Sequence, residues 1–145
     1  MNDAAEIRFG PLETLVGYQL RRAFLRSNQL FGALAGEVGL APGQYGVLTL
    51  IALNPGRSQS DIAGAAGLDR SSVTQMLDQL TARGWVERQP GPDRRSFSLF
   101  ITASGRSVCD AASRKVADHE RLICDALTKA EVATLLDLLA RLAPR

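Results

Sequence analysis

The sequence has few of the residues on which metal sites, disulfide frameworks and most catalytic mechanisms depend. It contains two cysteines and one histidine among 145 residues. Two cysteines cannot build a disulfide framework, and a single histidine leaves no spacing of zinc ligands to read. There is also no glycine-rich nucleotide-binding loop and no Ser or Cys nucleophile motif. The sequence therefore predicts no cofactor, no bound metal and no enzymatic activity.

Long apolar runs and a strong net charge are lacking too. No run approaches the roughly 18 apolar residues of a membrane-spanning helix, and the first ten residues lack the basic and then apolar pattern of a signal peptide. The formal net charge is only +2, so any attraction to nucleic acid must arise locally. Because 46% of the residues are hydrophobic and the composition shows no break, we expect one globular domain, cytoplasmic and independent of membranes.

A pair of short helices is predicted in the middle of the chain. Ser58 and Asp61 form a capping box that begins the first helix, and Gly67 ends it. Asp69 caps a second helix that begins at Arg70. The very short connection between the two helices is typical of a helix-turn-helix unit.

The second helix combines one apolar stripe with a polar outer face. Its apolar residues recur at spacings of three and four, whereas the opposite face carries short hydroxyls and carboxamides. Such groups can reach base edges and phosphate oxygens in a major groove, although an ordinary solvated surface is the alternative. From the helix pair, we predict DNA contacts by Ser58, Gln59, Arg70, Ser71, Ser72, Thr74, Gln75 and Gln79.

A β-ribbon is predicted after the helix pair. Residues 85–88 and 96–101 are β-prone, and a Pro-Gly-Pro-Asp-Arg-Arg turn separates them. We predict that Arg94 and Arg95, at the tip, enter a narrow minor groove, whose negative potential attracts guanidinium groups. Asp93 is predicted to stabilise this wing by holding one of the arginines through a charge-assisted hydrogen bond.

These motifs resemble those of the MarR family of winged helix-turn-helix transcription regulators. Residues 68–88 are similar to the family's recognition helix and first wing strand, and the family's wing pattern is matched by Asp93, Arg95, Leu99, Ile101, Thr102 and Gly105. The resemblance implies a mainly α fold with a small β-wing, and a homodimer bound to a pseudo-palindromic, double-stranded DNA operator. It further implies a ligand-responsive regulator, which we expect to be a repressor.

The terminal segments carry apolar stripes that need a partner. Helices are predicted over 11–37 and 103–126, and Thr128 and Glu131 form a capping box before a last helix. A two-fold dimer is the simplest way to bury these stripes. We therefore expect a single domain, 1–145, in which 11–37 and 103–143 form the helical dimerisation region and 42–101 form the winged helix-turn-helix lobe.

A ligand site is implied by the resemblance, because in this family small anionic aromatics bind between the dimer helices and the DNA-binding lobe. The ligand would be an aromatic acid or its coenzyme A thioester. A basic and aromatic cluster fits such an anion, although a solvated face with packing tyrosines is the alternative. The predicted ligand-binding residues are Tyr18, Arg22, Arg26 and Tyr45.

Three other residues invite a chemical role. We expect His119 to be a hydrogen-bonded residue at a helix interface and not a catalyst, because no partner lies beside it at motif spacing. Cys109 and Cys124 could be redox switches, but the peroxide-sensing relatives carry a cysteine near the start of the first helix, which this chain lacks. The alternative function is a winged-helix module that binds proteins without binding DNA.

Overall fold

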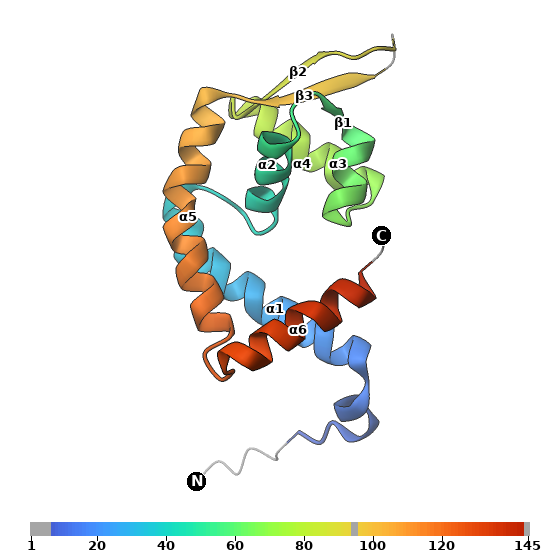
Figure 1. Cartoon of the computed structure of the whole chain (residues 1–145), viewed down its shortest axis with the longest axis vertical. Helices are drawn as coiled ribbons and strands as arrows, with labels where there is room; N and C mark the ends of the chain where they lie inside the picture. The colour runs from blue at the N-terminus through green and yellow to red at the C-terminus, as the bar shows by residue number, and fades with distance from the viewer. Residues whose placement is uncertain (1–6, 94–95, 144–145) are drawn as a thin grey trace.

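The computed structural model describes residues 7–93 and 96–143, and its elements follow one another from the blue N-terminal end to the red C-terminal end of Figure 1. Most of the described chain is helical, with one small antiparallel sheet, as the predicted fold class requires. The elements are the 3₁₀ helices η1 (Gly10–Thr14) and η2 (Gly36–Val38), the α-helices α1 (Val16–Ala35), α2 (Gln44–Leu53), α3 (Gln59–Ala66), α4 (Arg70–Ala82), α5 (Ala103–Ile123) and α6 (Lys129–Leu142), and the strands β1 (Arg57–Ser58), β2 (Val86–Pro90) and β3 (Phe97–Ile101).

The core lies where α2, α4 and the sheet meet. Leu48 and Ile51 of α2, Leu77 and Leu80 of α4, and Leu99 of β3 are almost completely buried. Full burial of such a side chain contributes about 1.5–3 kcal/mol. The predicted apolar stripe of the second helix is therefore confirmed, and the core fixes how α4 is presented.

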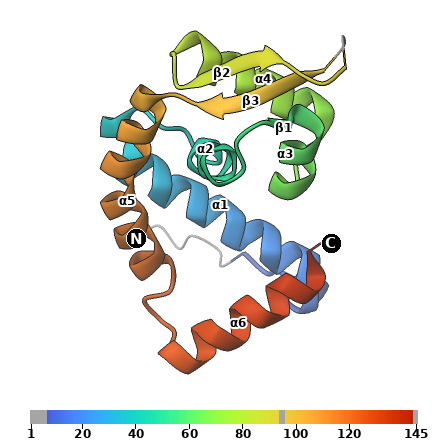
Figure 2. The same cartoon turned by 45° about the horizontal axis from the view of Figure 1, so that its top comes forward.

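The sheet has the order β1-β3-β2, with both pairs antiparallel. Val86 of β2 lies opposite Ile101 of β3, and Arg57 of β1 lies opposite Leu99 of β3. The sequence predicted the ribbon of β2 and β3 but not β1, because two residues are too few to show an alternating pattern. β1 leads directly into α3 and so ties the helix pair to the ribbon, as Figure 2 shows.

The first predicted helix, over 11–37, is shorter than expected. The backbone is extended at Leu15 (φ −83°, ψ 113°), which separates η1 from α1, and η2 and Gly39 (φ 74°) follow α1. The spacing of the apolar residues continues across this break. Such spacing indicates which residues share a face, but it does not show whether the helical backbone is continuous. The Gln19 side chain donates a 2.9 Å hydrogen bond to the Glu13 carbonyl beside the break. The helix predicted over 103–126 likewise ends early, at Ile123.

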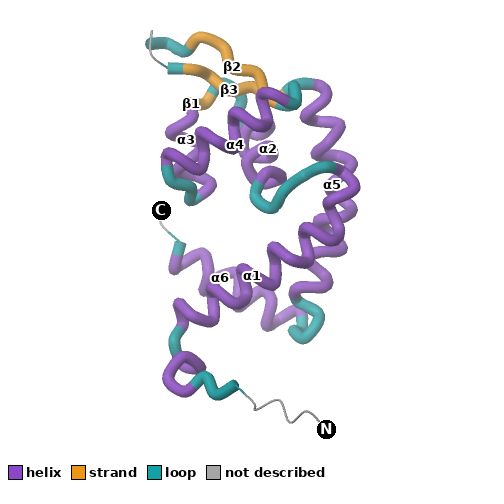
Figure 3. Tube along the Cα trace, turned by 180° about the vertical axis from the view of Figure 1, so that it is seen from behind, coloured by secondary structure: helices purple, strands orange, loops and turns teal. Residues whose placement is uncertain are grey.

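The two long helices α1 and α5 pack against each other, whereas α6 leads away from the end of α5. Figures 2 and 3 show this arrangement from two sides. The described part of α6 contains no buried residue. Leu136 and Leu142 of α6 and Phe24 of α1 expose 61%, 63% and 64% of their surface. The terminal helices thus present a large apolar surface away from the core.

Candidate nucleic-acid interface

Helix α4 presents the predicted polar face to solvent. Ser71, Thr74, Gln75 and Gln79 are exposed, on the side opposite Val73 and the other buried residues of the stripe. Together with Arg70 and Asp78 they line an open hollow of about 710 Å³. The structure therefore brings together five of the residues predicted to contact DNA, along one exposed helix face.

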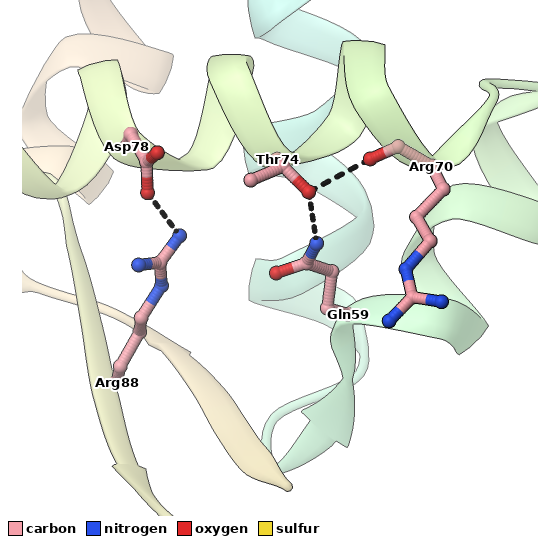
Figure 4. Close-up of polar contacts among 5 residues, drawn as sticks. All are labelled: Gln59, Arg70, Thr74, Asp78 and Arg88. Carbon is pink, nitrogen blue, oxygen red and sulfur yellow. Dashed lines mark hydrogen bonds and ion pairs between the residues drawn. The ribbon is translucent and has the colours of Figure 1, made fainter.

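Helix α3 adds Gln59 to this face. The Gln59 side-chain nitrogen donates a 2.7 Å hydrogen bond to Oγ1 of Thr74, and that hydroxyl donates a 2.7 Å hydrogen bond to the carbonyl oxygen of Arg70 (Figure 4). Two residues that the sequence predicted independently are thus linked across the helix-turn-helix unit. Spacing along the chain could not show this contact, because the two residues lie 15 positions apart.

An ion pair on the same face was missed by the sequence analysis. Arg88 of β2 donates a 2.7 Å hydrogen bond to the carboxylate of Asp78 on α4 (Figure 4). The side chain of Asp78 is 58% exposed, so the pair places a carboxylate and a guanidinium together at the surface of α4. Arg88 therefore offsets the one negative charge in the hollow and joins the recognition helix to the wing. The sequence predicted that Arg88 lies on a strand, but it gave no indication that Asp78 is its partner.

Two predicted contact residues take part in the helix caps, Ser58 as the cap of α3 and Ser72 as the partner of the α4 cap, Asp69. Ser58 accepts a hydrogen bond from the backbone N–H of Asp61, which completes the predicted capping box of α3. Ser72 donates its hydroxyl to the Asp69 carboxylate at 2.6 Å, and its backbone N–H bonds the same carboxylate. These hydrogen bonds from the Ser72 side chain and backbone lower the pKa of Asp69. Toward DNA, the Ser72 hydroxyl can therefore act only as an acceptor while this cap is intact.

The side chain of Gln79 is hydrogen-bonded to a buried residue of α2. The buried Gln44 of α2 donates its side-chain nitrogen to Oε1 of Gln79 at 3.2 Å, and Oε1 of Gln44 accepts the backbone N–H of Ala41. Gln79 thus lies at the edge of the polar face, with its amide oxygen already engaged.

The wing turn is held by its backbone. The N–H of Ser96 donates to the carbonyl of Asp93 at 3.0 Å, and the N–H of Gly91 donates to the carbonyl of Ser96 at 2.9 Å. Arg94 and Arg95 lie outside the described residues, and with them the predicted hydrogen bond from one of these arginines to the Asp93 carboxylate. Their roles at the wing tip stay predictions.

The predicted ligand-binding residues divide into separate groups. Arg22 lies over the ring of Phe9, 5.0 Å from its centre, and the Phe9 and Tyr18 rings are 6.4 Å apart. Arg26 pairs with Asp125 at 3.6 Å. The remaining member, Tyr45, packs against the core of the winged-helix lobe. Phe9, which joins Arg22 and Tyr18, was missed because it lies in a segment without periodicity.

His119 lies between α1 and α5, as predicted. It is 6% exposed, its Nε2 lies 3.1 Å from both oxygens of Ser27, and its Nδ1 lies 3.1 Å from the Glu120 carboxylate. Phe31 packs edge-on against its ring. This is the environment of a hydrogen-bonded interface residue.

Cys109 is half-buried between helices. Burial, with the nearby charge of Asp110, raises the pKa of its thiol. A raised pKa favours the unreactive thiol over the thiolate, which argues against a redox role for this residue. The two cysteines are both free.

In residues 7–93 and 96–143, every helix is too short or too polar to span a bilayer. Within the same ranges, no cluster of three or more His, Cys, Asp or Glu side chains is placed to hold a metal ion.

Solved structures show the same fold. The chain is similar to the transcriptional repressor CouR bound to a 23-mer DNA duplex, with a TM-score of 0.87 and 39% identity over 97% of this chain and 100% of that one. CouR bound to p-coumaroyl-CoA matches with a TM-score of 0.86 and 36% identity, covering 97% of this chain and 99% of that one.

Sequence comparison identifies the family. The profile of the MarR family matches residues 38–96, which contain the helix-turn-helix, β2 and the turn of the wing but not β3. The multiple antibiotic resistance protein MarR of Escherichia coli is 30% identical over 122 residues, which are 82% of this chain and 84% of that protein. The chain therefore belongs to the MarR family of winged helix-turn-helix transcription regulators.

Proposed function

We propose that the protein is a homodimeric repressor that binds a pseudo-palindromic DNA operator and is released by a small anionic ligand. The observation that carries this proposal is the exposed polar face of α4, with Gln59 and Arg88 bonded to it from the neighbouring elements. Hydroxyls, amides and a guanidinium on one helix face suit base edges and phosphates. The likeness to a repressor bound to DNA supports the same use of the face.

In this proposal, α4 lies in the major groove and Arg94 and Arg95 reach the adjacent minor groove. Ser58 and Ser71 bind phosphates, Gln75 reads bases, and the Ser72 hydroxyl accepts a hydrogen bond from a base edge. A two-fold dimer places the two recognition helices about 34 Å apart, one turn of DNA. Residues 11–37 and 103–143 hold the dimer, and 42–101 form the lobe that binds the operator. The exposed apolar residues of α1 and α6 support this division.

The ligand in this proposal is an aromatic acid or its coenzyme A thioester. Arg22 lies over the Phe9 ring, which neighbours the Tyr18 ring, and such a cluster suits an anion attached to an aromatic group. The likeness to CouR bound to p-coumaroyl-CoA supports the thioester. Bound ligand favours a spacing of the two DNA-binding lobes that no longer fits the operator. To convert the protein almost completely from the operator-binding spacing to the other one, the ligand must bind the second spacing more tightly by about 5.5 kcal/mol.

The experiment is fluorescence anisotropy with a duplex of the protein's own upstream intergenic region, at two salt concentrations. We expect tight, sequence-selective binding. A plot of the logarithm of the association constant against the logarithm of the salt concentration should have a negative slope of about 0.9 for each neutralised phosphate. Addition of p-coumaroyl-CoA, with free coenzyme A as control, is expected to release the duplex. Absence of selective binding to this region and to a randomised duplex pool would favour the alternative, a protein-binding module without DNA binding.

A further inference from the structure

The hydrogen bonds around Thr74 fix the orientation of the Gln59 amide. The Thr74 hydroxyl has one proton, and it lies 2.7 Å from the Arg70 carbonyl oxygen, which can only accept. The hydroxyl oxygen must therefore accept from Gln59, which lies 2.7 Å away. Only the nitrogen of the Gln59 amide can donate. Its nitrogen thus faces α4, and its carbonyl oxygen is turned away from Thr74 (Figure 4).

This orientation leaves a defined hydrogen-bonding edge. One N–H of Gln59 is used by Thr74, and within the described residues no hydrogen bond engages its carbonyl oxygen or its second N–H. With Thr74 on the N–H that points away from the carbonyl oxygen, the second N–H lies beside that oxygen, and the two form an acceptor next to a donor. In the major groove, adenine offers the complement, a donor at N6 next to an acceptor at N7, whereas guanine offers two acceptors.

The Gln59 side chain also lies where this edge can meet DNA. Gln59 is partly exposed and lines a hollow of about 430 Å³ between α3, α4 and β3. That hollow shares Arg70 with the larger hollow along α4. The Gln59–Thr74 contact thus lies beside the face that is proposed to enter the major groove, and its fixed geometry lowers the entropy lost on binding.

We infer that Gln59 reads an adenine of the operator and that Thr74 is the positioning residue that orients it. The inference rests on the proposed function and deepens it. It assigns part of the sequence specificity to the helix that precedes the recognition helix. A contact of Gln59 with phosphate would position the protein without specifying a base, and the experiment separates the two.

The test is selection from a randomised operator pool, followed by sequencing, with four proteins: the natural chain, Gln59→Ala, Thr74→Val and Thr74→Ser. We expect the natural chain to prefer adenine about tenfold at one position in each half-site. Gln59→Ala should lose that preference and keep the others. Thr74→Val, which keeps the shape but removes the hydroxyl, should reduce the same preference, whereas Thr74→Ser should retain it.

A double variant shows whether Thr74 acts through Gln59. Thr74→Val should have no further effect on the adenine preference when Gln59 is already alanine. If the natural chain selects an operator and Gln59→Ala weakens all sequences equally, Gln59 contacts phosphate and the inference is wrong, while the proposed function stands. If the natural chain selects no operator, both fail. Thermal unfolding of each variant verifies that the fold is intact.

Discussion

Among single residues, the pair of Arg88 and Asp78 contributes to the charge of the surface that is proposed to face DNA. We expect Arg88→Ala to weaken operator binding about tenfold, because it removes a cation and leaves the Asp78 carboxylate unpaired toward the phosphates. Part of the loss should be recovered in the double variant Arg88→Ala/Asp78→Asn, which removes the exposed negative charge. Anisotropy titrations of both variants at one salt concentration measure the effect.

The same pair offers a control. Asp78→Asn alone leaves Arg88 free to meet a phosphate, so its affinity should equal or exceed that of the natural chain. Equal affinities of Arg88→Ala and the natural chain would show that the ion pair has no role in binding.

At the scale of elements, Gly105 joins α5 to the wing. A Cβ at this position would overlap the carbonyl oxygen of Trp85 and lie 2.8 Å from Cγ1 of Ile101. Glycine lets the start of α5 approach the strand, where Thr102 bonds Gly84 and Trp85. We expect Gly105→Ala to destabilise the protein by about 1–3 kcal/mol, as overpacking does. Urea unfolding measures this change.

Gly64 of α3 is a matched control for Gly105. Nothing lies within 4 Å of a Cβ added there, so Gly64→Ala should be neutral or stabilise the helix by about 0.5–1 kcal/mol. A Gly105→Ala variant as stable as the natural chain would show that the wing and α5 can separate without cost.

Helix caps make the stability depend on pH. Hydrogen bonds from the Ser58 side chain and backbone lower the pKa of Asp61, and those from the Thr128 backbone and side chain lower the pKa of Glu131. Because the folded state lowers these values, the caps stabilise the protein above the ordinary carboxyl pKa of about 4. The contribution is lost as the pH falls through the lower, folded-state values. We expect the urea concentration at the midpoint of unfolding to decrease when the pH is lowered below about 4. The decrease should be smaller in Asp61→Asn. An equal fall in both proteins would contradict this cause.

At the scale of the whole molecule, the apolar faces of the terminal helices require a partner. We expect the chain to sediment as a dimer and Leu136→Glu to raise the dimer dissociation constant at least tenfold, because a charge would enter the proposed interface. Leu53→Glu is the matched control. Leu53 is 73% exposed on α2, outside the terminal helices, so this variant should remain dimeric. A monomeric natural chain, or a dimer unaffected by Leu136→Glu, would contradict the proposed division of the chain.

Local structure could be predicted from residues close together in the chain. The capping boxes at Ser58 and Thr128, the start of α4 at Arg70 and the apolar stripe around Leu77 depend on residues three or four apart, and the structure confirms all of them. The family could also be recognised from the sequence, because residues 68–88 and the wing pattern ending at Gly105 resemble those of MarR regulators. The apolar periodicity over 11–37 showed which residues share a face, but it did not reveal the break in the helix at Leu15.

The tertiary structure alone decided how the polar residues are paired. Gln59 with Thr74, Asp78 with Arg88 and Gln44 with Gln79 are separated by 15, 10 and 35 positions. Each pair joins two elements whose relative placement is set by the buried core, and sequence periodicity carries no information about that placement. Specificity depends on the direction in which each hydrogen bond points, and that direction exists only after the core has brought the elements together.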